Sequence, residues 1–156
     1  KTKVLILNSP SNPTGSVYQK EDLEALIPVI KKHNLFVISD EIYEKLVYDH
    51  LQFTSLASFE EIRDQVVIVN GVSKSFAMTG WRIGYAAGHA SIIKAMSKIN
   101  GHLTGNACSV SQRAAYAAIK DNLQDSYQLD NMQRIFEQRR NLGHKLLQEI
   151  PGISTT

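Results

Sequence analysis

Short apolar runs alternate with helical patterns along this 156-residue chain, and the alternation leaves few folds open. Three runs, at residues 4–7, 35–39 and 66–69, have the length and composition of buried strands, and each is followed by turn-forming or polar residues. Strands separated by helical segments pair in parallel, because each connection must cross a face of the sheet. The pattern therefore predicts an α/β fold with a mostly parallel sheet covered by helices.

Helical spacing of apolar residues predicts an amphipathic helix over about residues 20–33. Pro28 lies inside it, removes one backbone hydrogen bond and is expected to kink or restart the helix. Residues 83–87 form the fourth predicted strand, and after Gly88 only helical periods recur. Three further helices are predicted around residues 92–99, 109–119 and 129–150, with Gly143 as a candidate break in the last.

Composition is that of one ordinary globular domain. The hydrophobic content of 43% supports one compact core in a chain of this length. The net charge of +2 is spread without a basic cluster, so we expect no nucleic-acid partner and no membrane surface. Cys108 is the single cysteine, which excludes an internal disulfide and fits a cytoplasmic location. The five histidines lack metal-ligand spacing, so no metal site is predicted.

Lys74 is the most informative candidate for chemistry. It follows the apolar run 66–69, lies among glycine and serine, and precedes Arg82 by eight residues. Ligands of open α/β sheets bind beyond the carboxyl ends of the strands, where such a lysine would lie. Its amine can form a Schiff base with a carbonyl, although a lone lysine is usually a surface group.

Two other segments also follow predicted strands: SPSNPTG at residues 9–15 and DEIYE at residues 40–44. In this order and at these spacings, the three segments resemble the class I/II aminotransferases of the aspartate aminotransferase superfamily, which are fold-type I pyridoxal-phosphate enzymes. The resemblance extends along essentially the whole chain. It implies a three-layer α/β/α large domain that binds pyridoxal 5′-phosphate.

The resemblance also implies a domain organisation. Residues 1–144 would be the central and C-terminal part of the cofactor-binding large domain. Residues 145–156 would begin the connection to a small C-terminal domain. A phosphate loop and a ring-stacking aromatic are expected upstream of Lys1, and an arginine for the substrate carboxylate beyond Thr156. The isolated chain is therefore expected to be weakly active or inactive.

Four residues have implied roles at the reacting end of the cofactor. Lys74 would carry the Schiff base and then act as the general base. Asp40 would keep the pyridinium nitrogen protonated, its alternative role being a helix N-cap. Tyr43, three residues later, would hydrogen-bond the ring oxygen or simply pack against the sheet. Asn12 would donate to the same oxygen or serve only as a turn former.

Two residues are implied at the cofactor phosphate. Arg82 has a planar guanidinium suited to an oxyanion, its alternative role being a surface ion pair. Ser73 would add a donor. Gly71 stands three residues before Lys74, where many relatives place a serine, and Ser73 is the candidate replacement for that hydroxyl.

The implied activity is transfer of an amino group between an amino acid, aspartate-like or aromatic, and a 2-oxo acid, by a homodimer. A carbon–sulfur lyase or a cyclopropane-carboxylate-synthase-like enzyme shares these motifs and remains an alternative. A non-catalytic aminotransferase-like domain of a transcription regulator is another. The sequence shows no helix-turn-helix pattern that would favour the regulator.

Overall fold

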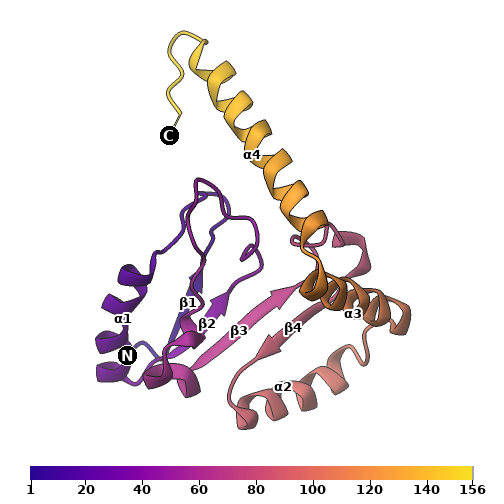
Figure 1. The fold of residues 1–156 in the computed structure, drawn as a ribbon. Helices are drawn as coiled ribbons and strands as arrows, with labels where there is room; N and C mark the ends of the chain where they lie inside the picture. The colour runs from indigo at the N-terminus through magenta and orange to yellow at the C-terminus, as the bar shows by residue number, and fades with distance from the viewer. Residues whose placement is uncertain (156) are drawn as a thin grey trace.

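The computed structural model describes residues 1–155, in which a sheet and its first helix are followed by a helical second half (Figure 1). Strands and helices alternate up to β4, after which all regular structure is helical. The elements are β1 (Val4–Asn8), α1 (Lys20–His33), β2 (Phe36–Asp40), η1 (Leu56–Ser58), η2 (Glu60–Gln65), β3 (Val66–Gly71), η3 (Thr79–Trp81), β4 (Gly84–Ala87), α2 (Ala90–Leu103), α3 (Ser109–Gln124) and α4 (Tyr127–Gln148).

The sheet has the strand order β1-β2-β3-β4. The first three strands are parallel, and β4 runs antiparallel to β3. Asn8 pairs with Asp40, and Asp40 pairs with Val69, so the carboxyl ends of the parallel strands lie side by side. The predicted α/β class with a mostly parallel sheet is confirmed.

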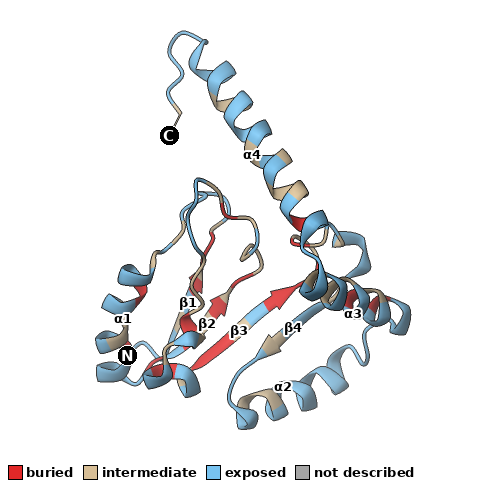
Figure 2. Ribbon diagram, viewed as in Figure 1, coloured by how far each residue is buried: buried red, intermediate tan, exposed pale blue. Residues whose placement is uncertain are grey.

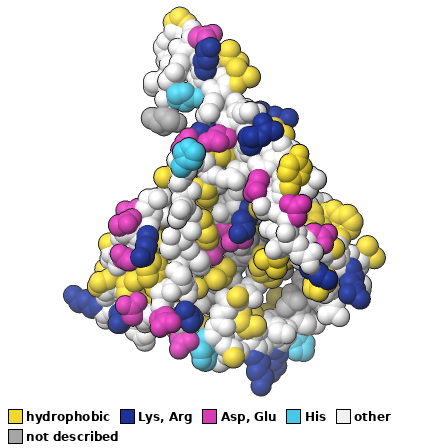
Figure 3. All heavy atoms as spheres, viewed as in Figure 1, with side chains coloured by type: hydrophobic (Ala, Val, Ile, Leu, Met, Phe, Trp, Pro, Cys, Tyr) yellow, Lys and Arg dark blue, Asp and Glu magenta, His cyan; other side chains and the backbone are white. Residues whose placement is uncertain are grey.

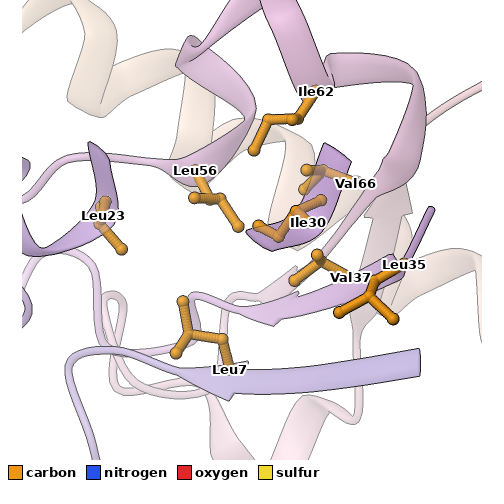
Figure 4. Packing of buried hydrophobic residues seen from close by; sticks show 8 residues of the cluster. All are labelled: Leu7, Leu23, Ile30, Leu35, Val37, Leu56, Ile62 and Val66. Carbon is orange, nitrogen blue, oxygen red and sulfur yellow. The ribbon is translucent and has the colours of Figure 1, made fainter. Parts of the chain in front are cut away.

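One face of the sheet carries the hydrophobic core. Side chains from β1, β2 and β3 pack there against α1, η1 and η2 (Figure 4). Burial alternates along β1, where Leu7 is 8% exposed and its neighbour Ile6 is 70% exposed. Figure 2 shows buried residues concentrated in the strands. The core cluster consists of Leu7, Leu23, Ile30, Leu35, Val37, Leu56, Ile62 and Val66.

Helix α1 continues through Pro28, so the expected restart does not occur. Leu23 and Ile30 lie on either side of the proline and are 2% and 1% exposed. Burial of each side chain contributes about 1.5–3 kcal/mol, which offsets the roughly 3 kcal/mol cost of an interior proline. Pro28 itself faces solvent, where water can hydrate the carbonyl that it leaves unpaired.

Helix α4 extends away from the sheet (Figure 1), and the candidate break at Gly143 is wrong because the helix continues to Gln148. The side chains of Gln133, Glu137 and Arg140 are spaced i, i+4 and i+7 along one helix face. Gln133 donates to the carbonyl of Val47, and Glu137 accepts from the main-chain N–H of Asp49. These contacts attach the first half of α4 to the loop after β2.

Candidate functional site

Asn12, Tyr43 and Lys74 come together beyond the carboxyl edge of the sheet. The Asn12 Nδ2 donates to the Tyr43 hydroxyl at 3.1 Å. The Lys74 Nζ lies 5.5 Å from the centroid of the Tyr43 ring. Three segments that follow β1, β2 and β3 therefore present an amide, a phenol and an amine to one region, as the spacing of the motifs predicted.

Asp40 ends β2 at the same edge of the sheet. Its Oδ1 accepts from the main-chain N–H of Ile42 at 3.2 Å. Residues 41–45 contain turns and no α-helix, so this bond caps a turn and the helix N-cap interpretation is wrong. The carboxylate is half-buried, and its Oδ2 lies outside that hydrogen bond. One carboxylate oxygen is thus fixed by the turn.

Ser73 and Arg82 are connected through Thr79. The Thr79 hydroxyl donates to the main-chain oxygen of Ser73 at 3.0 Å, and the Arg82 Nη1 donates to the main-chain oxygen of Thr79 at 3.1 Å. Arg82 has a left-handed backbone with φ of 55° and is exposed. The loop after β3 therefore folds so that the guanidinium returns toward the segment that carries Ser73, with further N–H groups available to an anion.

Position 71 requires glycine because β3 and β4 approach each other closely there. A Cβ on Gly71 would lie 2.7 Å from the carbonyl oxygen of Ile83 and 3.2 Å from the Cα of Gly84. Gly71 and Gly84 are direct partners in the antiparallel β3–β4 pair. A serine cannot occupy position 71 without displacing β4, so any hydroxyl near the loop has to come from another residue, such as Ser73.

Asn8 is a site residue that motif matching missed. Its Nδ2 donates to the main-chain oxygen of Asp40 at 3.2 Å, and its Oδ1 accepts from the main-chain N–H of Asn12 at 3.1 Å. The signal that could have identified it is an amide side chain at the last position of a strand, directly before the SPSNPTG turn.

Glu41 is a buried carboxyl next to the site and was also missed. It is 3% exposed and accepts from the hydroxyls of Ser39 at 2.9 Å and Ser55 at 2.8 Å. Burial raises the pKa of Glu41 above its ordinary value, and the two serine hydrogen bonds oppose that shift. The side chain connects the end of β2 to the start of η1 on the core side, whereas Asp40 belongs to the opposite side of the strand.

Other kinds of site lack support in residues 1–155. Those residues contain no group of three or more His, Cys, Asp or Glu side chains able to hold a metal ion. None of the helices described is long and apolar enough to cross a membrane. Acidic and basic side chains are interspersed on the face shown in Figure 3.

Known proteins resemble this chain over its whole length. Residues 1–156 match the family described as Aminotransferase class I and II. The aspartate aminotransferase of Bacillus subtilis (strain 168) is 48% identical over 155 residues, which make up 99% of this chain and 39% of that protein. The asparagine–oxo-acid transaminase of Streptococcus mutans serotype c is 45% identical over 153 residues, or 97% of this chain and 38% of that protein.

Solved structures show the same relationship. The aromatic aminotransferase of Pyrococcus horikoshii OT3 superposes with a TM-score of 0.89 at 40% identity, covering 95% of this chain and 39% of that one. The aspartate aminotransferase of Rhizobium meliloti gives a TM-score of 0.88 at 38% identity, covering 97% and 38%. The chain belongs to the class I and II aminotransferase family. It spans about two fifths of the length of the relatives that it matches.

Proposed function

We propose that the protein that carries this chain is a pyridoxal-phosphate-dependent aminotransferase. The observation that carries the proposal is the meeting of Asn12, Tyr43 and Lys74 beyond the edge of the sheet at which Asp40 ends β2. Members of this family are generally pyridoxal-phosphate-dependent and act on amino acids and oxo acids. The proposal extends to a homodimer in the cytoplasm.

The donor set fits the chemistry of pyridoxal phosphate. Asp40 offers a carboxylate oxygen for the protonated ring nitrogen. Asn12 and Tyr43 offer an amide and a phenol for the ring oxygen, and their mutual hydrogen bond already holds them together. Lys74 offers an amine for the aldehyde carbon. Arg82 and the hydroxyl of Ser73 offer donors for the phosphate, and Thr79 connects Arg82 to the main chain of Ser73.

Each residue then has a defined task in the proposed reaction. Bound pyridoxal phosphate supplies an aldehyde and an electron-withdrawing ring. Asp40 holds a proton at the ring nitrogen, since a carboxylate beside that atom favours its charged form. The Lys74 Nζ would hold the aldehyde group and, as a free amine, would take the proton from the substrate Cα and keep it on Nζ for return to the substrate. Asn12 and Tyr43 orient the ring, and Arg82 binds the phosphate.

The proposed substrates are an aspartate-like or aromatic amino acid and a 2-oxo acid. Support comes from the relatives, which carry the names aspartate aminotransferase, asparagine–oxo-acid transaminase and aromatic aminotransferase. The division of the chain at residue 144 stays a prediction. Helix α4 extends across that position, from Tyr127 to Gln148.

The first experiment is reduction with borohydride after pyridoxal phosphate is added to the protein that carries this chain. Wild type is expected to gain a stable adduct on Lys74, located by peptide mass spectrometry, and Lys74→Ala to lose it. Lys45→Ala is the matched control, because Lys45 is an exposed lysine two residues after Tyr43. Adducts distributed over several lysines, unchanged by Lys74→Ala, would refute the proposed function. The same reduction on the isolated chain tests whether residues 1–156 alone bind the cofactor only weakly, as expected.

A second assay separates the alternative chemistries. The protein is incubated with aspartate, an aromatic amino acid or a cysteine-type substrate, together with a 2-oxo acid. Formation of the amino acid that corresponds to the added oxo acid supports transamination. Release of sulfide or ammonia, without amino-group transfer, would instead support the carbon–sulfur lyase.

A further inference from the structure

Asn8 links three segments of the site through both ends of one amide. The Nδ2 donor faces the carbonyl of Asp40 and the Oδ1 acceptor faces the N–H of Asn12, at 3.2 and 3.1 Å. Asparagine and glutamine are the side chains that offer a donor and an acceptor on one planar group without charge. A single side chain therefore sets the spacing between the end of β2 and the turn after β1.

The hydrogen bonds of Asn8, together with the bond between Asn12 and Tyr43, connect the segments after β1 and β2 in a ring. Asn8 and Asp40 are register partners at the last positions of their strands. Tyr43 lies three residues beyond Asp40, and its hydroxyl accepts from the Asn12 side chain. The main-chain N–H of Asn12 in turn donates to the Asn8 side chain. Any movement of Asn8 changes the position of Asn12 relative to Asp40. The two groups serve different atoms of the proposed ligand, the ring oxygen and the ring nitrogen.

We propose that Asn8 is a positioning residue for the cofactor ring. It keeps the donors for the ring oxygen at a fixed separation from the carboxylate for the ring nitrogen, so that both can engage one rigid planar ligand. Donors held in place before a ligand arrives bind more tightly, because less order is lost on binding. The inference rests on the proposed function and assigns Asn8 no contact with the substrate.

Two variants and one control test the inference in the protein that carries this chain. Asn8→Leu removes both hydrogen bonds at similar size. Asn8→Asp keeps the acceptor for the N–H of Asn12 but places an oxygen against the carbonyl of Asp40. Gln65→Ala is the control, because the Gln65 Nε2 donates to the carbonyl of Leu35 at 2.9 Å, at the opposite end of the sheet. This control variant removes a side-chain to main-chain hydrogen bond of similar length far from the site.

Three readouts are compared. Amide hydrogen exchange of the cofactor-free protein is expected to lose protection at Asn12 in Asn8→Leu and to retain it in Asn8→Asp. Cofactor affinity is expected to fall about tenfold in both variants, which corresponds to about 1.4 kcal/mol. The pH midpoint of the visible band of the lysine-bound cofactor is expected to rise, because donors to the ring oxygen stabilise the deprotonated form. Gln65→Ala is expected to lower stability without changing these readouts.

The inference is overturned if Asn8→Leu keeps wild-type affinity and pH midpoint while Lys74 still forms its adduct. It is equally overturned if Gln65→Ala changes both readouts as much as the Asn8 variants do. Absence of a Lys74 adduct in wild type is a different result, because it refutes the proposed function and the role of Asn8 falls with it.

Discussion

A methyl group at Gly71 is expected to disrupt the junction between β3 and β4. The added Cβ would lie 2.7 Å from the carbonyl oxygen of Ile83, a distance that such atoms do not adopt without a shift. The two nearest obstructing atoms are backbone atoms of Ile83 and Gly84, at the start of β4. The Ile83 carbonyl also accepts from the N–H of Val72 at 3.3 Å. Relief therefore requires the start of β4 to move, because a shift of the nearby Ile42 side chain would leave the backbone clash in place.

Forced overpacking of this kind costs about 1–3 kcal/mol. With a urea dependence of about 1–3 kcal/mol per molar, the unfolding midpoint of Gly71→Ala should fall by roughly 1 M. Urea unfolding of wild type and variant, followed by circular dichroism, measures the shift. Lys74 lies three residues beyond Gly71, so the yield of the Lys74 adduct should fall as well.

Gly80→Ala is the matched control for this prediction. Gly80 lies in the same connection between β3 and β4, and a Cβ there would meet no atom within 4 Å. The control should keep the wild-type midpoint or raise it, since alanine restricts the unfolded chain by about 0.4–1 kcal/mol. Equal midpoints for Gly71→Ala and Gly80→Ala would refute the argument from the close approach of the strands.

Three further changes have expected outcomes. Gly143→Ala, inside α4, should raise stability by about 1 kcal/mol in thermal unfolding, and an unchanged midpoint would contradict the helix there. Burial raises the pKa of Glu41 from its ordinary 4.5, so its contribution to stability is greatest below that pH and is lost as pH rises through the folded-state pKa. Urea midpoints of Glu41→Gln should therefore fall less than those of wild type between pH 4.5 and 7, whereas parallel curves would contradict the raised pKa. The hydrogen bond from Arg140 lowers the pKa of Asp49 from 3.8, so its contribution is present above that pH and is lost as pH falls. Asp49→Asn should be slightly less stable than wild type at pH 7 in low salt, with a difference that shrinks in high salt, and a salt-independent difference would contradict the ion pair.

The parallel part of the sheet could be predicted because its signals are local. Apolar runs that end in turn residues define β1, β2 and β3. The long connections between them allow the three strands to run parallel. Helix α1 does not restart at Pro28, because burial of Leu23 and Ile30 on either side offsets the cost of the proline. Helix α4 likewise continues through Gly143, because one glycine in a 22-residue helix costs only about 1 kcal/mol.

The candidate site was predictable to the extent that its residues belong to motifs. The meeting of Asn12, Tyr43 and Lys74 followed from strand ends that share one edge. The reason for Gly71 could not be read locally, because it depends on β4 returning antiparallel to β3. The role of Asn8 depends on its register with Asp40, which no short pattern in the sequence encodes.

Helix α4 is hydrogen-bonded to the loop after β2 over only part of its length. Its contacts with the loop after β2 end at Arg140, whose guanidinium holds Asp49 through two hydrogen bonds. About 12 Å of helix continue from there to Gln148. A tilt of about 10° at the attached half would displace Gln148 by about 2 Å over that length. A rearrangement of the loop after β2 that tilts α4 would therefore be transmitted to Gln148, where a spectroscopic label would detect it.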